Sequence, residues 1–370
     1  MLTTLLPFST AAAQPFSPST ALAHLSNGTL LETREIQLFG LPLPVRTWQL
    51  TYKSLDAENQ PTTGRTTLVV PDTPWPGPRP LVSHQLAEDS LGTGCAPSAF
   101  LEHGLAARLN NGNAEAPLAV LALRRGWAVA FPDYQGPRER FLDKAQTAHS
   151  VLDALRAARA FAPADLRAAP VALAGFSGGA IASAWAAQAQ PAYAPDLPLT
   201  GLALGGLPTA FDEVIGTVSG TTNAGLGLLI LAAFHRLSPA SDLPALLNDQ
   251  GNRMLTKTQD YCGADFLTRY PFADIDTFTR APGIGSHPRI QAIARGLDLD
   301  ATAPPPAPTY LWHSTEDDVL PIATTDRLVA AWRGAGAPLT YVRTHDPSHA
   351  SSGIAGFPAA FDYLAERFAG

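Results

Sequence analysis

Residues 171–180 read Val-Ala-Leu-Ala-Gly-Phe-Ser-Gly-Gly-Ala, and they hold the strongest indication of the fold in the sequence. The apolar run before Gly175 predicts a buried strand, and a helix-compatible run begins near Gly178. A serine at such a sharp strand-to-helix turn takes a positive φ, for which Gly175 and Gly179 leave room. The alternative is a Gly/Ser turn without chemistry. The flanking strand and helix favour a nucleophile elbow, with Ser177 as the nucleophile and the N–H of Gly178 facing a developing oxyanion.

The composition is that of a globular protein with a full core. The 370 residues are 46% hydrophobic and 15% charged, which suits one large domain or a core with an insertion. The formal net charge is −7 and no basic cluster stands out, so the sequence argues against nucleic-acid binding. The longest apolar run, 224–234, is too short to predict a transmembrane segment, which needs about 20 residues.

The N-terminal residues 1–13 are small and apolar and end in three alanines. Such an ending is typical of a secretory signal before its cleavage site, although the basic start of a signal is missing. We therefore predict a partial signal remnant at 1–13 and a secreted, extracellular protein. The alternative is a frayed terminus without a targeting role.

Strand-like and helix-like stretches alternate along most of the chain. Two longer alternating runs, 45–54 and 65–70, predict an N-terminal antiparallel pair. Short, dense apolar runs, typical of parallel strands covered on both faces, lie at 81–84, 127–131, 171–174, 202–204, 310–312 and 339–342. Helical spacing is found at 142–161, 178–189, 323–333 and 357–368. The alternation predicts an α/β protein with a mostly parallel, doubly wound sheet.

The alternation stops between residues 209 and 298, where the chain is helix-like with few strand-like runs. We predict a core formed by 14–208 and 299–370, with 209–298 inserted as a helical cap over the carboxyl ends of the strands. The apolar segment 226–234 within this insertion has two interpretations. It is either a surface for acyl chains or lipid, or a cap helix buried in its own core.

A serine hydroxyl needs a base and an orienting acid to become a nucleophile, and in this kind of sheet they follow the serine in the order acid, then histidine. The stretch 309–321 is a strand followed by an acidic loop. Asp317 is the predicted triad acid, with Asp318 and then Glu316 as alternatives. A loop acid can also be a solvated turn residue or a helix cap.

The last strand, near 339–342, leads into a loop with two histidines. His349 lies deeper in the loop, just before the final helix, and is the predicted base, while His345 at the strand end is predicted to be structural. A metal site at these two histidines would need a helix there and a third ligand. Pro347 argues against the helix, and we predict no metal and no organic cofactor.

Two questions stay open on the residues alone. The second oxyanion donor should come from the loop at 85–98, but the residues do not fix which one donates. The chain has two cysteines, Cys95 and Cys262, which lack zinc-site spacing. They form either one disulfide in an exported protein or two buried thiols.

Four segments together resemble the secretory lipase family. The most specific is Ala-Glu-Asp-Ser at 87–90 followed by Cys-Ala-Pro-Ser at 95–98. The others are Phe-Pro-Asp-Tyr-Gln-Gly-Pro at 131–137, Gly-Phe-Ser-Gly-Gly at 175–179, and the 317–321 loop taken with His349. The likeness spans most of the chain, from about residue 15 to the end.

The resemblance implies an α/β-hydrolase fold with a large helical cap (lid), and secretion. It implies Ser177, Asp317 and His349 as the catalytic triad. It also implies that the N–H of Asp89 joins that of Gly178 in the oxyanion hole. A Cys95–Cys262 disulfide is implied as well, whereas the family's second cysteine pair has no counterpart here.

The sequence thus predicts a secreted serine carboxylester hydrolase acting on lipophilic esters, first of all triacylglycerols. The cap is expected to touch a lipid interface transiently. The alternative is an esterase for short acyl chains, acetylated sugars or polyesters, because acyl-chain preference is set by the cap and the acyl pocket. A non-catalytic binding module on the same scaffold is disfavoured by the complete triad.

Overall fold

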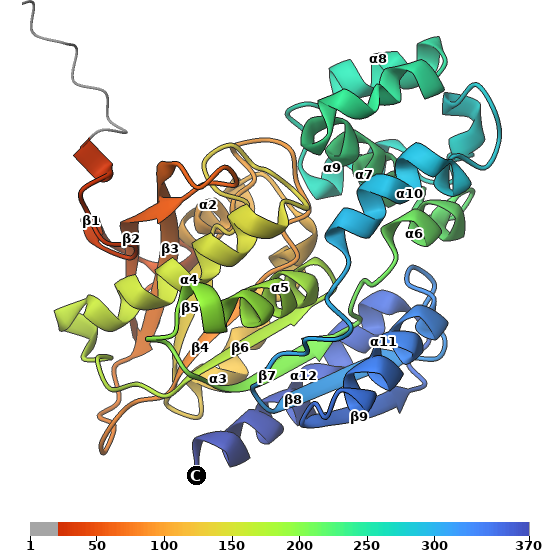
Figure 1. The fold of residues 1–370 in the computed structure, drawn as a ribbon. Helices are drawn as coiled ribbons and strands as arrows, with labels where there is room; N and C mark the ends of the chain where they lie inside the picture. The colour runs from red at the N-terminus through yellow and green to blue at the C-terminus, as the bar shows by residue number, and fades with distance from the viewer. Residues whose placement is uncertain (1–20, 370) are drawn as a thin grey trace, which may run out of the picture.

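The computed structural model describes residues 21–369, and the predicted signal remnant at 1–13 lies outside them. One nine-stranded sheet runs through the molecule in the order β1-β2-β3-β5-β4-β6-β7-β8-β9 (Figure 1). Its strands are β1 (Leu30–Ile36), β2 (Val45–Leu55), β3 (Pro61–Pro71), β4 (Leu81–Gln85), β5 (Ala128–Pro132), β6 (Val171–Phe176), β7 (Leu199–Gly205), β8 (Thr309–Ser314) and β9 (Leu339–Thr344).

The first strands are antiparallel and the rest are parallel. Strands β1 to β3 pair as an antiparallel ribbon, and β3 joins β5 antiparallel. From β5 through β4 to β9 every neighbouring pair is parallel. The predicted fold class is confirmed, and the predicted N-terminal pair is part of a three-strand ribbon. Strand β1 was not predicted, because its sequence, Leu-Leu-Glu-Thr-Arg-Glu-Ile, lacks the alternation of apolar residues that indicates a strand. Most of its residues are exposed.

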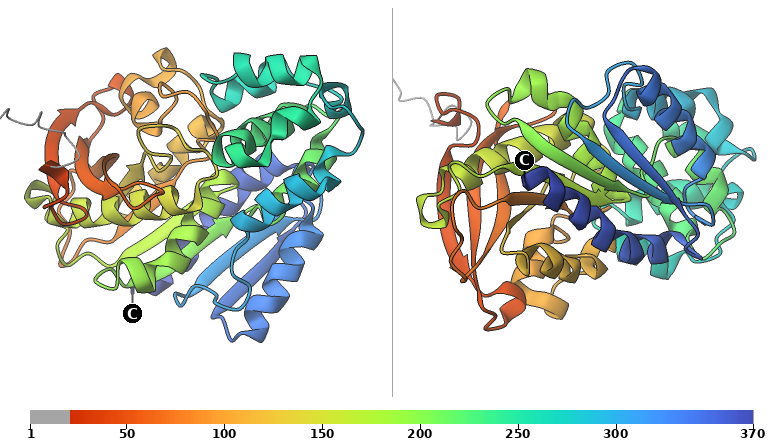
Figure 2. Two further views of the ribbon diagram at one scale, coloured as in Figure 1. Left: turned by 45° about the horizontal axis from the view of Figure 1, so that its top comes forward. Right: turned by 90° about the horizontal axis from the view of Figure 1, so that it is seen from below.

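Helices cover both faces of the sheet (Figure 2). One face carries α4 (Lys144–Ala160), α5 (Gly178–Tyr193) and α11 (Ile322–Gly334), and the other carries α3 (Val120–Leu123) and α12 (His349–Phe368). A short α2 (Pro97–His103) packs beside β3 and β5. Three tryptophans are almost fully buried between these layers, namely Trp185, Trp312 and Trp332. Strands covered on both faces explain the dense apolar runs of the sequence.

Between β7 and β8 the chain forms helices instead of strands. These are α6 (Phe211–Val218), α7 (Ala224–Leu237), α8 (Asp249–Lys257), α9 (Gly263–Arg269) and α10 (Pro288–Leu297). They gather beyond one end of the sheet (Figure 1), and we refer to residues 209–298 as the cap segment. Most of α7 is buried, including Leu228, Leu231 and Phe234. Helices α6 and α9 both pack on α7, and these buried residues of α7 belong to the same apolar cluster as the sheet core.

No single helix among residues 21–369 is long and apolar enough to cross a membrane. One pair within the cap segment, Ala224–Leu237 with Pro239–Leu246, passes by length and composition, but it is bent by 103°.

Candidate active site

Ser177 occupies the turn between β6 and α5. Its φ is 52° and its ψ is −121°, and its N–H donates to the carbonyl of Gly205 at 2.9 Å. A Cβ on Gly175 would collide with the carbonyl of Gly179, and a Cβ on Gly179 would collide with the carbonyl of Gln85. The two glycines therefore let the chain turn tightly enough to hold the serine in a conformation that L-residues seldom adopt.

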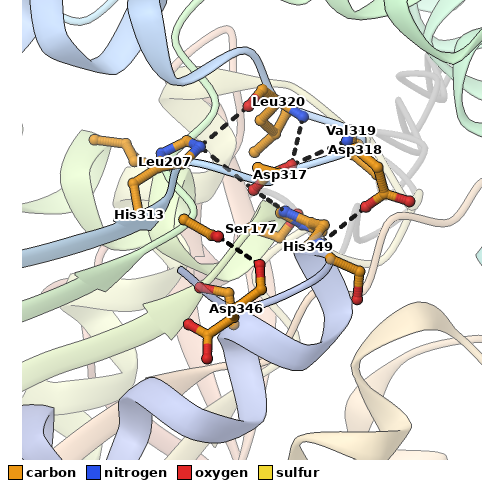
Figure 3. Close-up of polar contacts among 12 residues, drawn as sticks. Ser177, Leu207, His313, Asp317, Asp318, Val319, Leu320, Asp346 and His349 are labelled. Carbon is orange, nitrogen blue, oxygen red and sulfur yellow. Dashed lines mark hydrogen bonds and ion pairs between the residues drawn. The ribbon is translucent and has the colours of Figure 1, made fainter. Parts of the chain in front are cut away.

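The imidazole of His349 lies between Ser177 and Asp317. Its Nε2 is 2.8 Å from the Ser177 Oγ, and its Nδ1 is 2.7 Å from the Asp317 Oδ2. His349 is the first residue of α12, and the Ser348 side chain caps that helix by accepting the N–H of Ser351 at 3.2 Å. The structure thus brings together the three side chains from the ends of β6, β8 and β9 (Figure 3).

The carboxyl group of Asp317 is buried and tightly held. Its Oδ1 accepts the N–H groups of Val319 at 3.0 Å and Leu320 at 2.7 Å. Burial acts to raise the pKa of Asp317, but hydrogen bonds from His313 and His349 outweigh it and hold that pKa well below its usual range. The group is therefore a carboxylate at neutral pH, as an orienting acid must be.

His313 is a member of this network that sequence reasoning missed. It is fully buried on β8, and its Nε2 is 3.3 Å from the Asp317 Oδ2 and 3.1 Å from the carbonyl of Leu320. Its Nδ1 is 3.0 Å from the Thr325 Oγ1. The only sequence signal was a histidine inside an apolar strand, four residues before the acid. Figure 3 shows Asp317 between the two histidines.

The other candidate acids and the second histidine do not reach the imidazole of His349. The Asp318 Oδ1 accepts the backbone N–H of His349 at 2.9 Å and is exposed. Glu316 is also exposed and accepts from the Thr315 hydroxyl at 3.3 Å. The Nδ1 of His345 is 2.8 Å from the Thr315 Oγ1. The segment before α12 is not helical, as Pro347 indicated.

Asp89 lies beside the elbow, in the loop after β4. Its φ is 40°, and a Cβ on Gly178 would collide with its carboxyl group, so the two residues are in direct contact. The Asn111 Nδ2 donates to the Asp89 Oδ2 at 3.2 Å. Burial raises the pKa of Asp89 to about 6, against the opposing effects of Asn111 and His349.

Further buried carboxyl groups lie behind this loop. Burial raises the pKa of Glu139 to about 7 and that of Asp133 to about 6. Burial, and then the neighbouring Glu139, raises the pKa of Glu88 well above its usual range. The loop is held by the hydroxyl of Tyr134, which donates to the carbonyl of Leu86 at 2.8 Å. This side of the site therefore carries protonatable groups that burial keeps from ionising easily.

Cys95 and Cys262 form a disulfide, with Cα atoms 5.4 Å apart and a sequence separation of 167. The implied pairing is confirmed, and the alternative of two buried thiols is wrong. The bond joins the loop after β4 to the start of α9 in the cap segment. Next to it, the N–H of Gly263 donates to the Ser90 Oγ at 3.0 Å, so the cap segment and the Asp89 loop are held together.

A narrow apolar cavity extends from Ser177. The volume that a water-sized molecule can enter is only about 40 Å³. One wall comes from the core and the other from helices α6 and α7. The residues that line it, besides Asp89, Ser177 and Gly178, are Phe141, Leu142, Pro208, Phe211, Val214, Leu226, Leu229, Ile230, Val319 and Leu320. Segment 226–234 is thus mostly buried within α7, and three of its side chains also line the cavity beside Ser177. Its contact with acyl chains or lipid stays a prediction.

Comparison with known proteins identifies the family of this chain. The family model of the secretory lipases matches residues 102–370. The chain belongs to the secretory lipase family. A probable inactive lipase of Mycobacterium tuberculosis is 32% identical over 96% of this chain and 81% of its own length. A secreted triacylglycerol lipase of Malassezia furfur is 32% identical over 85% of this chain and 84% of its own.

Solved structures show the same fold for this secretory lipase. Candida antarctica lipase A superposes with a TM-score of 0.83 at 23% identity, covering 94% of this chain and 84% of that one. A rice cell wall degrading esterase from Xanthomonas oryzae gives a TM-score of 0.73 at 18% identity, covering 93% of this chain and 100% of that one. The α/β-hydrolase fold and the family are therefore as predicted, and the chain is a carboxylic ester hydrolase by family.

Proposed function

We propose that Ser177, His349 and Asp317 are the catalytic triad of this secretory lipase. The observation that carries the proposal is the continuous hydrogen-bonded chain from the Ser177 Oγ through the imidazole to the buried Asp317 carboxylate. The Ser177 Oγ attacks the ester carbonyl carbon while Nε2 of His349 takes its proton. The proton then passes to the leaving alcohol as the acyl-enzyme forms. Water attacks the acyl-enzyme by the same proton route and releases the acid.

The oxyanion of the tetrahedral intermediate is assigned to the N–H groups of Gly178 and Asp89. Gly178 is the first residue of α5, where backbone N–H groups have no partner within the helix. Asp89 adjoins it and lines the same cavity. The disulfide and the Ser90–Gly263 hydrogen bond support a fixed position for the Asp89 loop, which preorganised stabilisation of charge requires.

The substrate class that suits the cavity is a lipophilic ester, and we assign triacylglycerols first. The cavity walls beside Ser177 are mostly apolar, one wall coming from the core and the other from the cap segment, which favours an acyl chain over a sugar or a charged group. The name of the Malassezia furfur relative, a secreted triacylglycerol lipase, supports the same class. A rate series over acyl groups of two to sixteen carbons, run below and above the solubility limit, separates a lipase from a short-chain esterase.

We assign residues 209–298 as a cap that contacts a lipid surface during turnover. Phe272 supports this, since its side chain is 66% exposed and its backbone has a φ of 58°, a strained conformation for a bulky residue. Its N–H donates to the carbonyl of Thr221 at 2.7 Å, next to the start of α7. An extracellular site of action is supported by the secreted relatives and by the disulfide, and residues 1–13 are assigned to an export signal.

Hydrolysis of p-nitrophenyl esters by the wild-type chain and by Ser177→Ala tests the triad. Loss of the nucleophile should lower kcat by roughly 10⁴- to 10⁶-fold, and it should abolish covalent labelling by a fluorophosphonate. Ser241→Ala is a matched control, because that hydroxyl bonds within its own turn to the carbonyl of Ser238. Equal rates for wild type and Ser177→Ala would refute the proposal, and equal rates at the level of the uncatalysed reaction would mean that this chain is inactive, as its mycobacterial relative is named.

A further inference from the structure

Asp318 and Asp317 are neighbours in sequence, but they hold His349 in two different ways. Asp317 contacts the imidazole, whereas the Asp318 Oδ1 accepts the backbone N–H of the same histidine at 2.9 Å. Figure 3 shows both carboxylates directed at His349 from the same loop. The ring and the backbone of this histidine are thus fixed by adjacent residues.

The backbone contact matters because His349 begins α12. The first N–H groups of a helix lack a partner within the helix, and the helix dipole favours a negative charge there. Ser348 caps α12 through the N–H of Ser351, which leaves the N–H of His349 to Asp318. The Asp318 carboxylate at this point fixes the backbone of His349 and therefore the direction in which its imidazole points. That direction sets the 2.8 Å separation between Nε2 and the Ser177 Oγ.

The second oxygen of the same carboxylate contacts the cap segment. The Asn223 Nδ2 donates to the Asp318 Oδ2 at 3.1 Å. Asn223 is the residue just before α7, the helix that places Leu226, Leu229 and Ile230 in the cavity beside Ser177. One carboxylate therefore joins the helix that covers the substrate cavity to the backbone of the proposed base.

We propose that Asp318 is a positioning residue that couples the position of α7 against the core to the orientation of the His349 imidazole. With α7 in place, Asn223 holds the carboxylate and the carboxylate holds the N–H of His349, so the imidazole is aligned with Ser177. When Asn223 moves away, Asp318 is free to turn towards solvent and the alignment loosens. The coupling rests on the proposed ester hydrolysis, and its effect is modest because Asp318 is exposed.

Kinetics of Asp318→Ala and Asp318→Asn on a soluble short-chain p-nitrophenyl ester test the coupling. Asp318→Ala should lower kcat about 10-fold and change KM by less than about 2-fold, because alignment of the base acts on the chemical step. Asp318→Asn keeps one acceptor oxygen, which can still accept the N–H of His349, while its NH2 group cannot accept from Asn223. Its kcat should therefore lie between that of Asp318→Ala and that of wild type. A residue that only capped the helix would lower the melting temperature in both variants and leave kcat at 25 °C unchanged, and that result would overturn the proposal.

A double-mutant cycle with Asn223 tests the link to the cap. Asn223→Ala should lower kcat by about 2- to 5-fold, and adding it to Asp318→Ala should cost nothing more, because both changes break one connection. Glu213→Gln is the matched control, since it breaks another exposed contact of the cap segment, to Arg327 at 2.8 Å, away from the triad. Additive losses in the cycle, or an equal loss in Glu213→Gln, would contradict the coupling.

A second readout does not depend on turnover. The proton on Nδ1 of His349, hydrogen-bonded to Asp317, should give a downfield NMR signal. That signal should broaden in Asp318→Ala and stay sharp in Glu213→Gln. If wild type and Ser177→Ala hydrolyse esters equally, the proposed function fails, while this signal still shows whether Asp318 orders the histidine. A signal unchanged in Asp318→Ala would overturn the inference alone.

Discussion

Two of the edges at which the cap segment contacts the core differ in how they are held. At the edge beside Asp89, the Cys95–Cys262 disulfide is covalent. The Arg236 guanidinium adds hydrogen bonds to the carbonyls of Leu91 at 2.8 Å and Glu139 at 3.2 Å. We call this the disulfide edge.

The second edge runs along the loop that carries Asp317, the proposed triad acid. Its contacts are Asn223 with Asp318 at 3.1 Å and Arg327 with Glu213 at 2.8 Å, and both are exposed. We call it the acid-loop edge. Exposed pairs of this kind contribute about 0–1 kcal/mol each, whereas a native disulfide contributes about 2–5 kcal/mol.

This contrast predicts which half of the site stays fixed if the cap moves. The proposed oxyanion donors lie at the strong edge, so their positions should not change. The base and its neighbour Asp318 lie at the weak edge, next to the start of α7. We therefore expect the cap to turn about the disulfide edge and to open at the acid-loop edge.

The largest effect should follow removal of the disulfide. The bond closes a loop of 167 residues, and the chain-entropy model gives about 5 kcal/mol for such a loop, with measured values of about 2–5 kcal/mol. The Cys95→Ser and Cys262→Ser double variant should lose that free energy of unfolding, as measured by urea denaturation. Wild type in reducing agent should lose as much. A loss below about 1 kcal/mol would show that the two edges are equally weak.

The next effect is a dependence of stability on pH from the carboxyl groups at the disulfide edge. In the folded protein the pKa values of Asp89 and Asp133 are raised to about 6 and that of Glu139 to about 7. A raised carboxyl pKa adds stability that is fully present below the unfolded value and is lost as pH rises through the folded value. Asp317 has a lowered pKa and acts in the opposite sense, losing its contribution only below about pH 4.

We therefore expect the free energy of unfolding to be higher at pH 5 than at pH 8, by roughly a few kcal/mol. Chemical denaturation at the two pH values measures the difference. Glu139→Gln should reduce it, because the amide cannot ionise but can still accept from Gln135. Glu366→Gln, at an exposed position, should leave it unchanged. Stability that rises from pH 5 to pH 8 would rule out this account.

On the acid-loop edge, the strongest single change should be His313→Phe. It removes a hydrogen-bond donor from the buried Asp317 carboxylate, which costs about 1–3 kcal/mol. If that cost appears in the transition state, kcat should fall roughly 5- to 150-fold. His345→Gln is the control, since His345 is exposed and contacts Thr315. An unchanged kcat in His313→Phe would mean that His349 alone keeps Asp317 oriented.

The sequence was sufficient to predict those features of the site that depend on a short pattern of residues or on their order along the chain. The elbow depends on glycines two residues before and after Ser177, so its geometry could be predicted from five residues. The order of serine, acid and histidine, each after a strand, placed Asp317 and His349 at the same end of the sheet, because parallel strands end there together. The choice between His345 and His349 followed from position in the loop, and the structure brings His349 to the serine.

The sequence was insufficient to predict side-chain contacts that depend on the conformation of loops. Asp317 and Asp318 look equivalent in the chain, and only the bonds from Val319 and Leu320 show which carboxylate is turned inward. The contact of His313 with that carboxylate has no periodic signal, because a histidine in a buried strand resembles any satisfied core residue. Asp89 as the second donor came from the family resemblance, since the residues alone identified only its loop.

The smallest effect should come from the Arg327–Glu213 pair of the acid-loop edge. Its side chains are 63% and 47% exposed, so solvent screens the pair and the side-chain entropy of holding it offsets most of the attraction. Glu213→Gln should change the free energy of unfolding by less than about 0.5 kcal/mol, and high salt should remove even that difference. Urea denaturation at low and high salt measures both values. A loss above about 2 kcal/mol would mean that the acid-loop edge is held as firmly as the disulfide edge, and the cap would then have no preferred side on which to open.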